Sequence, residues 1–197
     1  MFNFFYKYSI CIIIVILLCF MVLVFSLESV GEFNVSSFEN NLDYSESSFV
    51  WPTPRFKTIT SPYGYRTAPI NGAGKFHAGI DIGASAGSEV LAAFSGEVTY
   101  IGFYGANGYT IRISDGTHMA NYSHVSPHFL VYIGQNINKG DIIATVGPKN
   151  VYDVPNNPYK DSNGNPTNGA TTGPHLHFSL YINGKSVNPL DYIKKDA

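Results

Sequence analysis

The stretch HLHFSLYINGK, residues 175–185, decides the fold class of this chain. Apolar and polar side chains alternate along it, and Asn183-Gly184 fits a tight hairpin turn. Side chains of a β-strand point to alternate faces, so His175 and His177 share one face of the expected strand. Two imidazoles held together on a strand form half of a transition-metal site, although a His-x-His pattern alone is a weak signal.

The rest of the folded part also has the pattern of an antiparallel all-β domain. Gly, Pro, Asn and Asp interrupt the chain about every eight to twelve residues, the spacing typical of short strands joined by turns. β-branched and aromatic residues fill the intervals, as in SEVLAAFSGEVTYIGF, GYTIRISDG and DIIATVG. No long amphipathic helix and no repeat of solenoid length is visible.

The amino-terminal segment predicts a membrane anchor. No charged residue lies between Tyr8 and Leu27, and this apolar run is long enough to span a bilayer. We expect residues 1–8 to be a short cytoplasmic end and residues 9–27 a transmembrane helix, because acidic residues without Lys or Arg follow the run. A cleaved signal peptide is the alternative, although VFSLES is a poor cleavage site. The folded part would then be extracytoplasmic, on a single-pass membrane protein or secreted.

Residues 28–50 are polar and acidic and predict a flexible linker, which places the folded domain at residues 51–197. From Arg55 onward the chain has a net charge of +2, which is too small to indicate a nucleic-acid partner. Both cysteines, Cys11 and Cys19, lie in the apolar run. A metal site in the folded domain must therefore use His, Asp or Glu.

The segment GKFHAGIDIGASAG contains a second pair of candidate ligands, His77 and Asp81. Its glycines disfavour a helix, and a straight strand would separate residues four apart by about 13 Å. The chain must therefore bend between them if both bind one ion, which Ala78-Gly79 permits. Alternatively, Asp81 only makes hydrogen bonds with the local backbone.

A third motif, NYSHVSP, contains His124 on an alternating stretch. A lone strand histidine is usually structural. However, four of the six histidines fall in three compact motifs, each beside small or turn residues that would let a substrate backbone come close. This co-occurrence favours one shared site.

The motifs SPYGYR, FHAGIDIGASAGSEVLAAFSGEV, NYSHVS, VYIGQNINKGDIIATVG, TTGPHLHF and INGKSVNPLDYI together resemble the lysostaphin-type, or LytM-type, zinc metallopeptidases. The resemblance runs in family order from about Trp51 to Ile193. It implies a compact antiparallel β-sandwich of the duplicated hybrid motif type, with a substrate groove and a single zinc ion. It also implies that the substrate is a peptide cross-link or stem of bacterial peptidoglycan.

The resemblance assigns roles to the histidine motifs. The implied zinc ligands are His77, Asp81 and His177. The implied catalytic residues are His124 and His175. Three protein ligands leave a fourth zinc position for water, as in catalytic sites. Whether each catalytic histidine transfers protons or donates hydrogen bonds to an oxyanion stays open at this point. Candidates for substrate contact are Asn121 and His118.

The chain departs from the family at residues 150–168, where a long segment rich in Asn, Pro, Gly and Asp replaces a short loop. This segment either walls the groove or is a mobile surface loop. Calcium binding is set aside because Pro166 stands where an EF-hand needs glycine and Thr172 replaces the bidentate Glu.

Two other functions fit parts of the sequence. The first is a membrane-anchored scaffold that binds wall or an envelope protein partner, but the complete ligand set favours an enzyme. The second is a biotinyl- or lipoyl-type carrier, because GQNINKGDIIATVG resembles those small barrels. No lysine stands in the required hairpin-tip setting, which disfavours a carrier.

Overall fold

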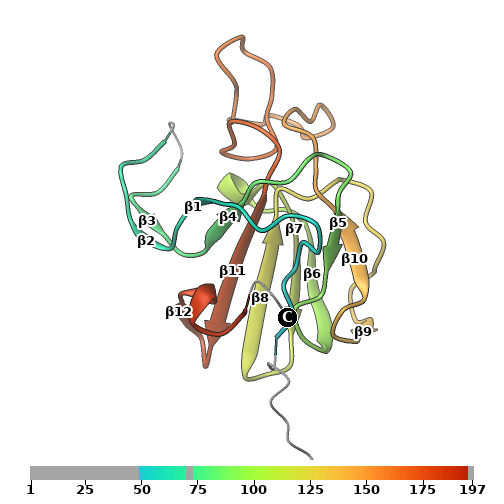
Figure 1. Cartoon of the computed structure of the whole chain (residues 1–197). Helices are drawn as coiled ribbons and strands as arrows, with labels where there is room; N and C mark the ends of the chain where they lie inside the picture. Colours follow the sequence, from blue (N-terminus) through green and yellow to red (C-terminus); the bar gives the residue numbers. More distant parts are fainter. Residues whose placement is uncertain (1–48, 70–72, 195–197) are drawn as a thin grey trace, which may run out of the picture. The chain divides into compact units, whose positions relative to one another are not determined.

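The computed structural model describes residues 49–69 and 73–194, and these form strands and two short 3₁₀ helices (Figure 1). The strands are β1 (Ile59–Ser61), β2 (Gly64–Tyr65), β3 (Phe76–His77), β4 (Ile80–Ile82), β5 (Glu89–Leu91), β6 (Gly96–Phe103), β7 (Tyr109–Ser114), β8 (His118–Ser123), β9 (Asn136–Ile137), β10 (Ile142–Thr145), β11 (Leu176–Ile182) and β12 (Lys185–Val187). The helices are η1 (Gly105–Asn107) and η2 (Pro189–Asp191). Within the described ranges, no helix is long and apolar enough to cross a membrane. The transmembrane helix expected at 9–27 lies outside the described residues.

The main sheet has eight strands in the order β1-β4-β11-β8-β7-β6-β9, with β12 paired to β11. All of its pairings are antiparallel, which confirms the predicted fold class. The hairpin between β11 and β12 turns at Asn183 and Gly184, both with positive φ, as a tight two-residue hairpin turn requires. Strand β11 pairs with β4, β8 and β12, so the stretch that predicted the fold class lies in the interior of the main sheet.

One face of the main sheet is the hydrophobic core. Leu176, Phe178 and Leu180 of β11 are fully buried there, together with alternate residues of β4, β7 and β8. A second sheet, made only of β5 and β10, contributes Val90 and Ile143 to the same core. The second layer of the expected sandwich is therefore small.

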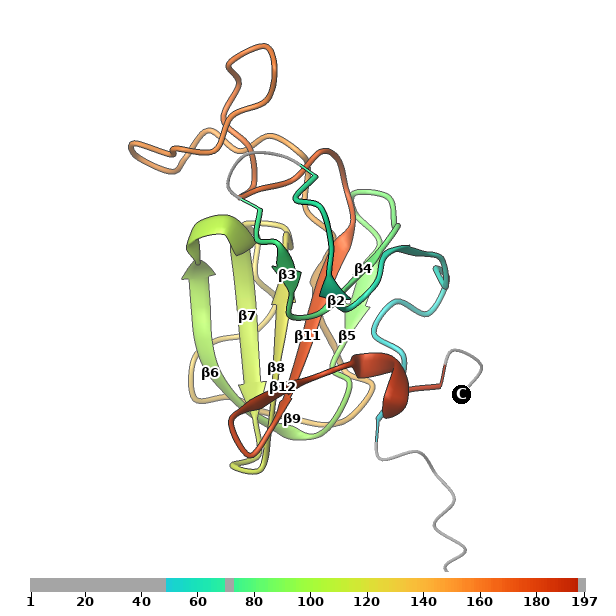
Figure 2. The same ribbon diagram turned by 90° about the vertical axis from the view of Figure 1, so that its left-hand side faces the viewer.

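The opposite face of the main sheet is polar. His177, Ser179 and Tyr181 of β11 project from it, as the alternation predicts, and the cross-strand partners of His177 and Ser179 are Ser123 and Asn121 of β8. The β2–β3 hairpin lies in front of this face (Figure 2). We call this polar face of the main sheet the groove face.

The core begins slightly before the predicted boundary of the folded domain. Phe49, which falls in the range 28–50 assigned to the linker, is buried against Phe94 at a centroid distance of 5.5 Å. Trp51 is also buried, and its Nε1 donates to the carbonyl oxygen of Phe56 at 2.7 Å. The large aromatic side chain therefore docks into the domain itself.

The segment 150–168 projects above the sheet in Figure 1 and has hydrogen bonds of its own. Asp161 accepts backbone N–H groups from Asn163 and Asn165 and pairs with Lys149 at 3.2 Å. Tyr109 donates to Asp153 at 2.6 Å and so ties the segment to β7. None of residues 150–168 lines the groove, so in this structure the segment stands beside it.

Candidate metal centre and active site

A groove of about 610 Å³ lies over the groove face and contains all five residues predicted for zinc binding and catalysis. Its walls come from the β2–β3 hairpin, strand β4, helix η1 and the segment 170–175 that leads into β11. Motifs that lie about 100 residues apart in the sequence thus meet in one place, as the distance of 2.9 Å between His77 Nε2 and His177 Nδ1 shows.

The chain bends between His77 and Asp81, as the sequence predicts. His77 ends β3, which pairs with β2, whereas Asp81 lies in β4 directly opposite His177 of β11. The bend passes through Gly79, where an added Cβ would lie 2.5 Å from the carbonyl oxygen of Phe178. Only glycine allows this approach, which brings His77 Nε2 to 3.1 Å from Asp81 Oδ1.

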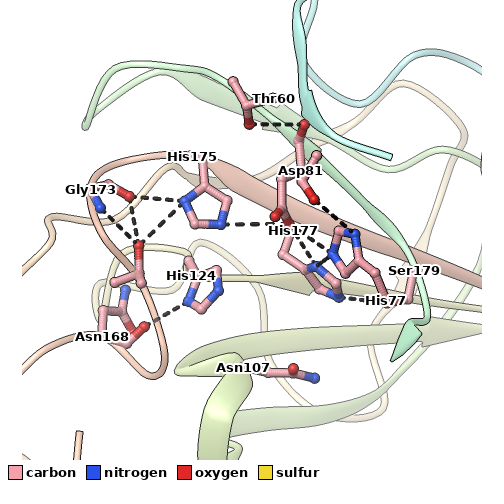
Figure 3. Close-up of polar contacts among 12 residues, drawn as sticks. Thr60, His77, Asp81, Asn107, His124, Asn168, Gly173, His175, His177 and Ser179 are labelled. Atoms are coloured by element: carbon pink, nitrogen blue, oxygen red, sulfur yellow. Dashed lines mark hydrogen bonds and ion pairs between the residues drawn. The ribbon is translucent and has the colours of Figure 1, made fainter. Parts of the chain in front are cut away.

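Three ligand atoms converge on one point (Figure 3). His177 Nδ1 lies 2.8 Å from Asp81 Oδ1, and the other two pairs are 2.9 and 3.1 Å apart. Ligands at the zinc distances of 2.0–2.2 Å in a tetrahedron lie about 3.3–3.6 Å from one another, so the three atoms would have to separate by only a few tenths of an ångström to take up the ion. The three residues therefore fit a zinc ion.

The contacts around these ligands fix which atoms face the centre. His77 Nδ1 donates to the carbonyl oxygen of Pro62 at 2.8 Å, so neutral His77 has a lone pair on Nε2. His177 Nε2 lies 2.9 Å from Ser179 Oγ, which leaves Nδ1 for the centre. Arg66 binds the outer oxygen, Oδ2, of Asp81 at 3.2 Å. Lone pairs that converge in this way suit a cation between them, and second contacts of this kind are typical of metal ligands.

The charge states also suit a cation. Burial by itself raises the pKa of Asp81, but contacts with His177 and His77 outweigh burial and hold the pKa well below its usual range. Burial lowers the pKa of His177, and the nearby Asp81 carboxylate only partly opposes this shift. At neutral pH the centre therefore has an ionised carboxylate and a neutral His177, the forms that bind a metal.

His175 and His124 lie beside the centre without belonging to it. Their rings are 4.6 Å apart, and His175 Nε2 lies 3.6 Å from Asp81 Oδ1. His175 Nδ1 contacts the carbonyl oxygen of Gly173 at 2.9 Å, and His124 Nδ1 contacts that of Asn168 at 2.6 Å. Because a carbonyl oxygen only accepts, both Nδ1 atoms carry the proton, and Nε2 of each neutral ring is a free acceptor.

The backbone of His124 is unusual. Its φ is 58°, a left-handed conformation that is rare for a residue other than glycine. Hydrogen bonds hold it there, from His124 N to Asn107 O and from Gly147 N to His124 O, both at 2.9 Å. Burial lowers the pKa of His124 well below its usual value, and electrostatic coupling to the neighbouring His175 and His177 rings adds to this effect. His124 is thus neutral at pH 7.

The two residues suggested for substrate contact lie on different faces of β8. Asn121 faces the groove side but is only 3% exposed, and its Oδ1 accepts from Arg112 Nε at 2.8 Å. His118 lies on the other face, where its ring packs against Phe49 and Phe94. The structure brings Asn121, and not His118, to the groove side.

Two residues of this site received no role from the sequence. Arg66 was visible only as part of the SPYGYR motif, with no sign that it would reach Asp81. Asn168, at the end of the long segment, is fully buried; its side chain accepts from Tyr109 N at 2.7 Å and donates to Val125 O at 2.9 Å. Its loop-like surroundings in the sequence gave no signal of this contact with the site.

Comparison with known proteins identifies this arrangement. A sequence model described as Peptidase family M23 matches residues 75–189, a range that contains the three converging ligands and both neighbouring histidines. The chain belongs to peptidase family M23. The resemblance seen in the motifs is thereby confirmed.

Among M23 relatives, the chain is 33% identical over 136 residues to the DD-carboxypeptidase/endopeptidase Mpg of Neisseria meningitidis, covering 68% of this chain and 27% of that protein. It is 32% identical over 143 residues to an uncharacterised metalloprotease of Haemophilus influenzae, covering 71% of this chain and 26% of that protein. The chain thus spans about a quarter of the length of these curated relatives.

A solved structure with the same fold is the catalytic domain of lysostaphin from Staphylococcus simulans. The TM-score is 0.54 at 25% identity, covering 71% of this chain and 92% of that domain. The M23 fold expected from the motifs is therefore present, with its antiparallel main sheet.

Proposed function

We propose that this chain is a zinc-dependent metalloendopeptidase that hydrolyses peptide bonds in the cross-links or stems of bacterial peptidoglycan. The observation that carries the proposal is the convergence of His77, Asp81 and His177 within one groove, beside two further histidines. Membership of family M23 supports a peptidase, and a relative from Vibrio cholerae named peptidoglycan DD-endopeptidase ShyC supports a cell-wall substrate; it is 29% identical over 136 residues, covering 68% of this chain and 27% of that protein. A structural neighbour from Vibrio cholerae is described as a zinc-containing peptidase, with a TM-score of 0.56 at 25% identity over 72% of this chain and 39% of that chain.

The chain's own residues would divide the chemistry between them. When bound, zinc lowers the pKa of a coordinated water to about 7 and polarises a carbonyl group. His124 is neutral and has a free Nε2, so we assign it the acceptance of a proton during attack. His175 contacts both His124 and Asp81. Once its Nε2 has taken up a proton, His175 is placed to donate a hydrogen bond to the oxyanion or a proton to the leaving amine.

Metal removal tests the proposed function. We expect a zinc chelator to stop the release of soluble fragments from purified peptidoglycan, and added Zn²⁺, but not Mg²⁺, to restore it, because His and Asp donors at this spacing suit zinc. Fragment release that continues from protein shown to contain no metal would overturn the proposal. Bound zinc without cleavage of several wall types would instead favour the scaffold function.

We also propose that residues 9–27 anchor the chain in the cell membrane, with the domain at 51–197 on the extracytoplasmic side and the linker at 28–50 between them. The support is the uncharged apolar run that follows Lys7. We expect the chain to stay in the membrane fraction after alkaline extraction and its domain to be digested by protease added to spheroplasts. Recovery of a shortened chain in the medium would indicate a cleaved signal peptide instead.

A further inference from the structure

The groove face carries a second polar cluster that the proposed reaction does not use. Arg112 of β7 donates from Nε to Asn121 Oδ1 at 2.8 Å. Its guanidinium carbon lies 5.7 Å from the ring centre of Tyr100 and 5.3 Å from that of Tyr104, within the range of cation–π contacts. Tyr100 is itself fixed, since its hydroxyl donates to the carbonyl oxygen of Phe103. The cation is therefore held in one place by neutral groups.

No acidic side chain of residues 49–69 or 73–194 forms an ion pair with Arg112. This distinguishes it from Arg66, the other arginine on this side, whose charge is matched by Asp81. The Asn121 amide occupies only Nε of Arg112. The terminal nitrogens, Nη1 and Nη2, remain for a ligand, and a guanidinium presents these donors in the geometry that a carboxylate accepts.

The cluster lies on the same face of the main sheet as the metal centre, a few residues away from it. Arg112, Asn121 and Ser179 lie opposite one another on β7, β8 and β11, and Ser179 is two residues from His177 on the same face. With strands about 4.8 Å apart and about 3.4 Å per residue, the Cα atoms of Arg112 and His177 lie roughly 12 Å apart. An extended peptide crosses that distance in about three or four residues, and the arginine side chain shortens it further.

Tyr181 connects the cluster with the groove. It lies beyond Ser179 on the same face of β11, and its side chain lines the groove. Burial raises the pKa of Tyr181, whereas the positive charge of Arg112 lowers it. The charge of the guanidinium is therefore felt at Tyr181, a residue of the groove wall. Figure 2 looks onto this face.

We propose that Arg112 binds a free carboxylate of the peptide substrate, two to four residues from the bond that is cut, and that Asn121, Tyr100 and Tyr104 hold it in position. This inference rests on the proposed function and narrows its substrate class. A bridge made only of glycine has no carboxylate between its ends, whereas an acidic stem peptide does. The cluster therefore favours cleavage at stems that retain free carboxylates over cleavage of glycyl-glycyl bridges.

The test compares two peptides of equal length that differ only in one side carboxylate, free in the first and amidated in the second. For the wild-type chain with zinc we expect a lower KM for the acidic peptide. Arg112→Gln should raise that KM about 10- to 100-fold, the range for loss of a hydrogen bond to a charged group, and leave kcat and zinc content unchanged. The amidated peptide should not distinguish the two proteins. Arg55→Gln, at an exposed arginine, is the matched control.

A second variant tests the same idea without removing the arginine. Asn121→Asp places a carboxylate against the guanidinium and should abolish the preference for the acidic peptide. Equal effects of Arg112→Gln on both peptides, or none on either, would overturn the inference while cleavage itself upheld the proposed function. Calorimetry of peptide binding tests the case in which the proposed function fails but the carboxylate site is correct. Binding of the acidic peptide that depends on Arg112, without any cleavage, would contradict the endopeptidase function and uphold the carboxylate site.

Discussion

His77→Ala is expected to lose bound zinc and peptidoglycan hydrolysis together. The variant keeps Asp81 and His177 but has only two of the three converging ligand atoms. Because Lewis-acid stabilisation by a metal is worth several kcal/mol of barrier, we expect the hydrolysis rate to fall by at least about 10³-fold.

The measurement pairs zinc content per chain, by mass spectrometry of the metal, with the rate of fragment release from peptidoglycan. The control is His128→Ala, which removes an exposed histidine that does not line the groove. This control should keep both properties. A His77→Ala protein that hydrolyses peptidoglycan at the wild-type rate would show that the centre is not required.

His124→Ala is expected to keep its zinc and lose turnover. His124 Nε2 is a free acceptor beside the centre, and His124 is not among the converging ligands. Loss of a general acid–base group lowers kcat by about 10²- to 10⁴-fold, with a smaller effect on KM.

Zinc content and thermal melting must be measured on the same His124→Ala preparation. The backbone of residue 124 is in the left-handed region, so a substitution there also changes the stability of the fold. His118→Gln is the matched control, because His118 begins strand β8, which leads directly into His124, but its ring packs on the core face of that strand. Loss of zinc from His124→Ala would contradict its role as a proton acceptor and make it a structural part of the centre.

The features that the sequence predicted are those that depend on local geometry. The alternation in residues 175–185 predicts His175 and His177 on one face because the strand period is two, and both line the groove although β11 begins at Leu176. The bend at Gly79 follows in the same way, since one ion cannot be reached by His77 and Asp81 from a straight strand.

The sequence did not predict on which side of β8 the neighbouring side chains lie, because this depends on where the regular alternation of the strand ends. His118 and His124 are six apart, so a continuous strand would place them on the same face. Strand β8 ends at Ser123, and the left-handed backbone of His124 turns its side chain to the groove while His118 faces the core. Asn121 is three residues from His124, a spacing that would put them on opposite faces of a continuous strand. Because the strand ends before His124, both lie on the groove side.

Contacts across long sequence separations were also beyond the sequence patterns. Asn168 reaches His124 because the segment 150–168 folds back onto itself, with Asn150 and Thr167 paired at its base. The choice between a wall and a mobile loop rested on composition alone, and composition does not encode such pairing.

The most direct test of the account is to identify the ends that this chain creates. Peptidoglycan is incubated with the zinc-loaded wild-type chain and, in parallel, with Asp81→Ala, and new amino termini are identified by mass spectrometry. The account predicts new amino termini within peptide stems or cross-links that appear with the wild type and are absent with Asp81→Ala. No new termini from a wild-type chain that contains one zinc per molecule, or the same termini from both proteins, would contradict it.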